Sequence, residues 1–334
     1  MGSAACCAQP NRAFDTMTEK KENMTATSTT QEQKVGIIYC PRPGFRRRWK
    51  KIRNRFESIG AHVDYIKGEN SADAERIAAM MARNGYQAII VVGGDAALNY
   101  ALNGIMKTPA PGGKRPSLGV IPAGYANDFA RYWGFMPSDY KRNIASLMAN
   151  RCRRIDVGVC RTTTESGEHE DYFINCVNIG VAASIMGLRH LTFSLLGLRT
   201  LSHLLSAVML LFKRMSYKLA FTTGGEQFEK RAMTLCIGSA HGYGQTPSAV
   251  PYNGLLDVSL VSKAQTTQLL HGLWLLFTGR FLSHRGISVW RTRGISFSRL
   301  GEAPISFDGR FAYSHASQLT ADVLPEEIDF IIQP

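Results

Sequence analysis

The chain has 334 residues, of which 45% are hydrophobic and 19% are charged, and its formal net charge at pH 7 is +13. This length and composition exclude a wholly disordered chain and allow two ordinary domains. The basic balance favours anionic partners, such as nucleotide phosphates, an acidic membrane surface or nucleic acid, without choosing among them. Seven cysteines without a C-x-x-C pair or a zinc-type spacing indicate the reduced thiols of a cytoplasmic protein.

Residues 1–33 differ in composition from the rest of the chain. They are rich in Ser, Thr, Gln, Glu and Lys and have almost no apolar periodicity, so we expect a disordered tail. The start, MGSAACC, resembles a myristoylation signal but has Cys6 where Ser or Thr is expected. Gly2 with Cys6 and Cys7 could form a dually acylated anchor only in a eukaryotic cell, and we expect instead a leader without an anchoring role. No apolar stretch precedes a cleavage site, which argues against a secretory signal.

Strand and helix patterns alternate from residue 34 onward. Short β-branched runs predict strands at 34–40, 61–66, 87–95 and 118–124. Apolar residues spaced by three or four, together with capping residues, predict helices at 45–60, 71–85, 97–106 and 125–134. This alternation indicates a parallel sheet with crossover helices, and thus an α/β domain over residues 34–155.

After residue 155, short strands separated by polar turns predominate. We expect them at 155–161, 171–181, 217–223, 232–239, 254–261, 286–290, 294–299, 304–310 and 327–332. Short turns favour antiparallel pairing. The pattern therefore predicts a mostly antiparallel β-sandwich domain over residues 156–334, and it leaves open whether the last strands return to the first domain.

Two strand ends of the first domain carry glycine turns, VVGGD (91–95) and IPAG (121–124). Ligands bind at the carboxyl ends of parallel strands, where glycine and a following helix N-terminus admit a phosphate. Beside phosphates, the carboxylate of Asp95 would hold a cation or accept a proton. A tight turn in which Asp95 caps the helix explains this short motif about as well.

Taken in order, a larger set of segments resembles the catalytic family of diacylglycerol and sphingosine kinases. They are YCPRPG (39–44), VVGGDAALNYALNG (91–104), IPAGYANDFAR (121–131), RRIDVG (153–158), FINCVNIGVAA (173–183), PSAVPYNGLLDV (247–258) and FDGR (307–310). The resemblance covers residues 34–334. It implies an NAD-kinase-like domain that binds ATP, a second domain that binds a lipid, and transfer of the γ-phosphoryl group to a lipid hydroxyl with Mg²⁺ assisting.

The same resemblance implies site residues. The catalytic set is Asp95, Asp308 and Arg310, and the metal set is Asp95, Asn253 and Asp257. The residues expected to bind ATP are Pro41, Gly44, Gly93, Gly94, Asp95, Ala96, Ala97, Asn99, Gly124, Tyr125, Asn127 and Asp128.

Several of these positions depart from the family pattern. Ala96 and Ala97 replace Gly-Thr, Tyr100 replaces a common Glu, Tyr125 replaces Thr, Cys40 replaces Asn and Asn253 replaces Asp. Each lost hydroxyl removes a hydrogen bond worth about 0.5–1.5 kcal/mol, so ATP binding is expected to be weaker without being abolished.

The most consequential departure is Arg310. It stands where bacterial members have the glutamate of Asp-Gly-Glu, which is thought to act as general base. Arginine is essentially always protonated and cannot accept that proton, so we expect Asp95 to be the base. Arg310 then either supplies positive charge near the γ-phosphate or is a surface cation on a β-turn, and the sequence leaves both interpretations open.

Basic and apolar segments suggest where the enzyme acts. Eight basic residues lie within residues 42–55, and they either bind phosphates and anionic headgroups or form the solvated face of a helix. The apolar stretches 191–212 and 268–282 are interrupted or too short to span a bilayer, and we expect one of them to line an acyl pocket. We therefore predict a lipid substrate, peripheral binding to an anionic membrane surface and no nucleic-acid partner, with a homodimer left open.

The sequence keeps two further functions open. The GGD turn is shared with NAD kinases, so a soluble dinucleotide kinase is one alternative. A catalytically silent member that binds nucleotide or lipid as a regulator is another. Diacylglycerol, a sphingoid base, ceramide and undecaprenol all remain candidate acceptors.

Overall fold

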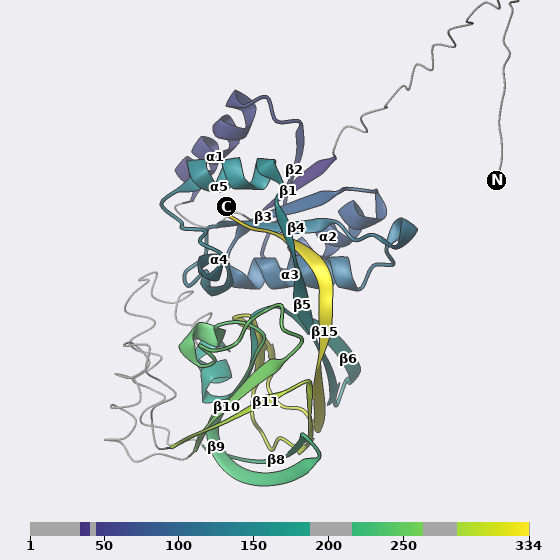
Figure 1. Ribbon diagram of the computed structural model, residues 1–334, viewed down its shortest axis with the longest axis vertical. Coiled ribbons are helices and arrows are strands. Elements are labelled where there is room, and N and C mark those ends of the chain that lie inside the picture. The colour runs from purple at the N-terminus through teal and green to yellow at the C-terminus, as the bar shows by residue number, and fades with distance from the viewer. Residues whose placement is uncertain (1–33, 41–44, 188–215, 263–285, 334) are drawn as a thin grey trace, which may run out of the picture. The chain divides into compact units, whose positions relative to one another are not determined.

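The computed structural model of the chain describes residues 34–40, 45–187, 216–262 and 286–333 (Figure 1). The expected tail at 1–33 and the apolar stretches 191–212 and 268–282 lie outside these ranges, as do Pro41 and Gly44. Among the described residues, no helix is both long and apolar enough to cross a membrane.

The first domain is the parallel α/β unit that the sequence predicts. Its elements are β1 (Val35–Tyr39), α1 (Arg46–Ser58), β2 (Val63–Lys67), α2 (Asp73–Arg83), β3 (Ala88–Gly93), α3 (Asp95–Met106), β4 (Ser117–Pro122), α4 (Asp128–Tyr132) and α5 (Tyr140–Ala149). The strands run in parallel in the order β2-β1-β3-β4. Figure 1 shows α1 and α5 on one side of this sheet and α2 and α3 on the other.

Burial explains why these segments form a layered domain. Every residue of β1, β3 and β4 is buried, as expected for parallel strands covered on both faces. Helix α2 buries Ala74, Ile77, Ala78, Met81 and Ala82, which recur every three or four residues and form one apolar face.

The second domain is an antiparallel β-sandwich, also as predicted. Its strands are β5 (Cys152–Thr164), β6 (Gly167–Phe173), β7 (Cys176–Gly180), β8 (Tyr217–Thr223), β9 (Glu226–Gly238), β10 (Leu256–Ser262), β11 (Ile287–Thr292), β12 (Gly294–Arg299), β13 (Ile305–Phe307), β14 (Arg310–Tyr313) and β15 (Gln318–Ile331). A separate apolar core, to which Phe173, Phe221, Leu235 and Phe307 contribute, fills this domain.

One strand joins the two domains. β15 pairs antiparallel with β12 and β5, and at its far end Phe330 pairs in parallel with Leu118 of β4. The last strand of the chain therefore enters the sheet of the first domain, and Figure 1 shows it running along both.

Three local predictions differ from the structure. The run 171–181 is divided into β6 and β7 by a break at Ile174–Asn175. The strand expected at 87–95 ends at Gly93, so that Asp95 lies in the first turn of α3. The helix expected at 125–134 is the short α4, and the sequence analysis did not predict α5.

The contact between α2 and α3 generates a test of the fold. A Cβ added at Gly104 of α3 would lie 2.1 Å from the carbonyl oxygen of Glu75 in α2. Alanine normally stabilises a helix interior relative to glycine by about 1 kcal/mol. Here overlap with the backbone should reverse the sign, so we expect Gly104→Ala to lower the free energy of unfolding in urea by about 1–3 kcal/mol.

Asn54→Ala, at an exposed position of α1, is the matched control for helix propensity. It should stabilise the protein by a few tenths of a kcal/mol, roughly. A Gly104→Ala protein as stable as the wild type would show that α2 and α3 do not approach as closely as the structure places them.

Candidate active site

Two glycine turns meet at the carboxyl edge of the parallel sheet. A Cβ added at Gly94 would lie 2.7 Å from the Cα of Gly124, and one added at Gly124 would lie 2.4 Å from the Cα of Gly94. Neither turn therefore has room for a side chain. Gly93 is equally restricted, because its Cβ would lie 2.8 Å from that of Ala97. Gly94 and Gly124 are therefore needed for the contact between the two turns, whether or not they also admit a phosphate.

The N-terminus of α3 opens at this edge. Gly94 is its N-cap, with extended backbone, and Asp95 is its first residue. The first N–H groups of an α-helix have no partner within the helix and can bind an anion. Ala96 is half-buried and Ala97 is only 2% exposed, so the two alanines line the start of the helix without contributing a hydroxyl.

The second turn is held by an asparagine. Asn127 has a positive φ of 49°, and its side-chain oxygen accepts a hydrogen bond of 2.6 Å from the amide of Gly124. Its Nδ2 donates back to the carbonyl of Gly124 at 3.0 Å. Asn127 therefore closes the turn on itself. Tyr125 lies half-buried within the same turn.

Asp128, the first residue of α4, connects this turn to the second domain. One of its carboxylate oxygens accepts from Asn175 Nδ2 at 2.9 Å and from the backbone N–H of Tyr243, also at 2.9 Å. Asn175 in turn accepts from the backbone N–H of Gly242 at 2.9 Å. A loop of the second domain is thus fixed against the carboxyl edge of the first domain's sheet.

Asp308 is the most fully engaged carboxylate of the site. It is 3% exposed and occupies the first position of the two-residue turn Asp308–Gly309 between β13 and β14, where both residues have positive φ. It accepts four hydrogen bonds of 2.8–3.0 Å, from the backbone N–H groups of Ile174, Asn175 and Cys176 and from the side chain of Asn99. Burial raises the pKa of Asp308, and these donors oppose the rise.

Two neighbouring carboxylates, Asp128 and Asp308, act on the ionisation of Asp95. Removal of water raises the pKa of Asp95 to about 7, with further contributions from the charges of Asp128 and Asp308. Backbone N–H groups of Asn127 and Phe129 donate to Asp95 and partly offset that rise. A carboxylate with a pKa near 7 can accept and release a proton at neutral pH.

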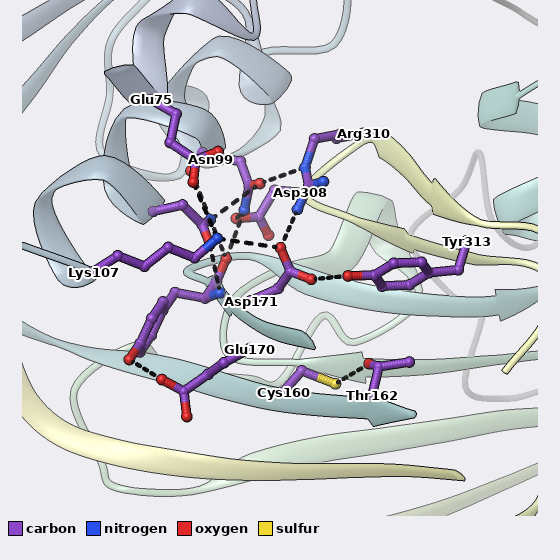
Figure 2. Close-up of polar contacts among 12 residues, drawn as sticks. Glu75, Asn99, Lys107, Cys160, Thr162, Glu170, Asp171, Asp308, Arg310 and Tyr313 are labelled. Atoms are coloured by element: carbon purple, nitrogen blue, oxygen red, sulfur yellow. Dashed lines mark hydrogen bonds and ion pairs between the residues drawn. The ribbon is translucent and has the colours of Figure 1, made fainter. Parts of the chain in front are cut away.

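Asn99 and Asn103 of α3 join the helix to the second domain, and Figure 2 shows Asn99 beside Asp308. Asn99 Nδ2 donates to Asp308 at 2.9 Å and to the carbonyl of Tyr172 at 2.8 Å. Asn103 exchanges two hydrogen bonds with the backbone of Tyr172, of 2.9 and 3.0 Å. Asn99, which the sequence analysis assigned to ATP, therefore holds the domain junction.

Arg310 points into this junction, so the interpretation as a surface cation is wrong. Its side chain is 14% exposed; Nη2 lies 2.8 Å from an oxygen of Asp171 and Nε lies 3.0 Å from Asn99 Oδ1 (Figure 2). The guanidinium also lies over the ring of Tyr100, 4.9 Å from its centroid. Asp171 additionally accepts from the hydroxyl of Tyr313 and lies 3.9 Å from Lys107 Nζ.

The predicted metal ligands fall into different surroundings. Asp257 is bound through both oxygens by Arg291, at 2.6 and 3.0 Å, and also accepts from Ser248. Asn253 accepts a hydrogen bond from the amide of Leu255. None of the contacts described for Asp257 joins it to Asp95 or Asn253, and Asp257 would have to leave Arg291 to bind a metal. Its metal role stays a prediction.

The residues around Asp95 fit a nucleotide with its cation better than they fit a protein-only metal site. Within the described ranges, no three His, Cys, Asp or Glu side chains are grouped as metal ligands. Mg²⁺ commonly takes one or two carboxylates and completes its shell with phosphate oxygens and water. Asp95 beside the N-terminus of α3 is compatible with that arrangement.

Sequence reasoning missed several residues of the junction. Asp171, Asn103 and Asn175 act through partners more than sixty residues away in the chain, which no local pattern reveals. Tyr243 had a local signal, because it stands between two glycines in SAHGYGQ (239–245). His241 in the same segment is exposed and packs its ring against Tyr132.

Comparison with known protein families divides the chain in the same two parts. Residues 34–160 match the model of the diacylglycerol kinase catalytic domain. Residues 176–332 match the model of the YegS C-terminal NAD kinase beta sandwich-like domain.

Curated relatives are similar along most of their length. A diacylglycerol kinase from Staphylococcus carnosus is 23% identical over 301 residues, which are 87% of this chain and 92% of the relative. A diacylglycerol kinase from Bacillus subtilis is 23% identical over 291 residues, covering 84% and 90% of the two chains.

Solved structures show the same fold. A crystal structure of a putative diacylglycerol kinase from Bacillus anthracis superposes with a TM-score of 0.70 at 19% identity, covering 91% of this chain and 99% of that one. Yeast NADH kinase, solved with NADH, superposes with a TM-score of 0.51 at 9% identity and covers 91% and 85% of the two chains.

The buried pair between Arg310 and Asp171 generates a test of the junction. Asp171→Asn keeps the shape of the side chain but leaves the guanidinium without its counter-charge. We expect the free energy of unfolding in urea to fall by about 3–5 kcal/mol, the usual cost of breaking a buried ion pair from one side. Arg310→Leu should also destabilise, and the double variant should lose less than the sum of the two.

The exposed pair between Arg53 and Glu57 is the matched control, with side chains 55% and 51% exposed. Glu57→Gln should change stability by about 1 kcal/mol or less. Strictly additive losses at Asp171 and Arg310 would contradict the pairing.

Proposed function

This chain belongs to the diacylglycerol kinase family, and on that premise we propose that it is a phosphotransferase that moves the γ-phosphoryl group of ATP to the hydroxyl of a lipid. The acceptors that the proposal covers are diacylglycerol, a sphingoid base and ceramide. The observation that carries it is the position of Asp95, a carboxylate with a pKa near 7 between two glycine turns and the start of a helix.

In this proposal Asp95 is the general base. It would take the proton of the acceptor hydroxyl as that oxygen forms its bond to the γ-phosphorus and the bond to the β-phosphate oxygen breaks. Asp128 and Asp308 raise the pKa of Asp95, which makes it a better base at neutral pH. Phosphoryl transfer depends mainly on positioning and on electrostatic stabilisation, so a base of this strength suffices.

Asp308 and Arg310 take supporting parts. Both oxygens of Asp308 already accept hydrogen bonds, so its contribution is its charge and the position it gives to Asn99. Two nitrogens of Arg310 are engaged by Asn99 and Asp171. Contact between Arg310 and a phosphate would use its remaining N–H donors, on Nη1 and Nη2, and this role stays a prediction.

ATP and Mg²⁺ have a place in the proposal that agrees with the residues present. The backbone at Gly94 and Gly124 and the first N–H groups of α3 would hold the phosphates. Asp95 would be the protein ligand of Mg²⁺, which when bound neutralises phosphate charge.

Peripheral membrane binding is the second part of the proposal. Helix α1 buries Ile52 and Phe56 but exposes six basic residues, which are Arg46, Arg47, Lys50, Lys51, Arg53 and Arg55. Such a surface attracts anionic lipids at roughly 1 kcal/mol per basic residue. A homodimer and the absence of a nucleic-acid partner stay predictions from the sequence.

If Asp95 is the general base, its substitution should lower turnover, and the activity of the wild type should depend on pH. Wild-type protein incubated with labelled ATP, Mg²⁺ and mixed micelles of the candidate lipids should form a phosphorylated lipid. Asp95→Asn should lower turnover by at least about a hundredfold, the usual contribution of a general base. Because the base acts when ionised, wild-type kcat/KM should rise about tenfold per pH unit at acidic pH and level off once Asp95 is ionised. Mg²⁺ bound beside the carboxylate would move that plateau below pH 7.

Asp64→Asn is the matched control, at an exposed position of β2 where the amide oxygen still accepts from Tyr86. It should leave turnover unchanged.

The raised pKa of Asp95 also makes the stability of the protein depend on pH. The folded state favours the protonated carboxyl, so the contribution of Asp95 to the free energy of unfolding is fully present below about pH 4 and is lost as the pH rises through 7. Asp95→Asn should therefore melt above the wild type at pH 8. Wild-type turnover in Asp95→Asn would remove Asp95 from catalysis.

The membrane proposal predicts vesicle binding that depends on charge. Flotation with phosphatidylglycerol-containing vesicles should recover the protein at low salt and less of it at high salt, because salt screens these attractions. Lys50→Glu with Lys51→Glu should weaken binding by about thirtyfold or more, from the roughly 1 kcal/mol per basic residue removed.

Lys230→Glu with Arg231→Glu makes the same change in charge on exposed residues of β9. This pair should bind vesicles nearly as the wild type does. Equal recovery of all three proteins, or equal recovery on pure phosphatidylcholine vesicles, would contradict a membrane role for α1.

A further inference from the structure

A strained loop of the second domain aims a tyrosine at the proposed base. Gly242, Tyr243 and Gly244 have successive positive φ values of 55°, 56° and 85°. Glycine adopts this left-handed backbone readily, but a tyrosine does so only at a cost in free energy. Such strain persists where surrounding contacts impose it, and it concentrates at functional sites.

Two backbone hydrogen bonds hold the loop in this strained conformation. The backbone N–H of Tyr243 donates to Asp128 at 2.9 Å, and that of Gly242 donates to Asn175 at 2.9 Å. Asn175 also donates to Asp128, so the loop is tied to α4 of the first domain through two adjacent side chains. Asp128, at the carboxyl edge of the parallel sheet, therefore helps to set the position of Tyr243.

The phenol hydroxyl of Tyr243 is buried and has no hydrogen-bond partner among the described residues. It lies against Gly309, since a Cβ added there would be 2.6 Å from the hydroxyl oxygen. The same added atom would be 3.9 Å from the Cβ of Asp95. Because Gly309 has no side chain, the hydroxyl of Tyr243 can lie in this position near Asp95.

A buried hydroxyl without a partner is costly and rare in folded proteins. Burial and the charges of Asp95, Asp308 and Asp128 raise the pKa of Tyr243, so the group remains an O–H donor. A donor in these surroundings lacks an acceptor atom, and the oxygen of a bound substrate would supply one.

We propose that the Tyr243 hydroxyl donates a hydrogen bond to the acceptor oxygen that is phosphorylated, across from Asp95. This inference rests on the proposed function and names a further catalytic residue for it. The acceptor oxygen would give its proton to Asp95, accept from Tyr243 with one lone pair and attack the γ-phosphorus with the other. Tyr243 belongs to the second domain, which would let that domain align the acceptor with the base.

Tyr243→Phe removes this hydroxyl alone. The variant should lower kcat for lipid phosphorylation by about tenfold to a hundredfold, because it removes a donor used in the transition state. The KM for ATP should change by less than about twofold, since the proposal places the hydroxyl on the acceptor. Without ligands, the melting temperature should be unchanged or raised, because the lost group is buried and unpaired.

Tyr65→Phe is the matched control, because the Tyr65 hydroxyl is also buried and without a hydrogen-bond partner in the described part of the chain. It lies on β2, packed against Trp49 and Phe56. Its removal should leave kcat unchanged. A structural role for Tyr243 would instead lower the melting temperature together with kcat.

The experiment can overturn the role of Tyr243 without overturning the proposed lipid kinase function. If the wild type phosphorylates a lipid and Tyr243→Phe does so at the same rate, the role of Tyr243 is overturned and the kinase stands. A loss of kcat accompanied by a lower melting temperature also overturns it. If the wild type phosphorylates none of diacylglycerol, sphingosine and ceramide, the proposed function fails, and the role of Tyr243 fails with it.

Discussion

The buried carboxylate of Asp308 is the group around which the junction of the two domains is organised. A carboxylate at 3% exposure is stable only when its oxygens are satisfied, and here four N–H donors satisfy them. Three of the donors are consecutive backbone amides, and the chain has to break its extended conformation at Ile174–Asn175 to present them. The fourth comes from Asn99 on α3. One charge therefore explains the division between β6 and β7 and contributes, beside β15 and Asn103, to the attachment of the first domain to the second.

Charge around Asp95 follows from the same arrangement. Asp128 and Asp308 obtain their hydrogen bonds largely from amides, which stabilise the carboxylates without cancelling their charge. Asp95 receives only two backbone donors and lies in the field of both neighbours. Removal of water together with these two charges raises its pKa, and a cation bound beside it would favour the ionised form.

Two residues that depart from the family pattern, Tyr100 and Arg310, contact each other in the structure. Tyr100 and Arg310 stand far apart in the sequence, yet the guanidinium lies over the ring at 4.9 Å. Asp171 supplies the counter-charge and Asn99 accepts from the same arginine. The substitution of a basic residue for an acidic one is thus accommodated by an aromatic surface and a buried carboxylate.

The sequence by itself determined the class of fold, because strand–helix alternation and later short polar turns follow from periodicity that each segment carries alone. It also located the glycine turns, whose lack of a side chain is a local property of Gly93, Gly94 and Gly124. Only the tertiary structure decided the environment of Arg310, the partners of Asp257 and the strained conformation of Tyr243. Those depend on charges and hydrogen bonds between residues distant in the chain, such as Asp171 and Arg310, and no local pattern encodes which distant group becomes a neighbour.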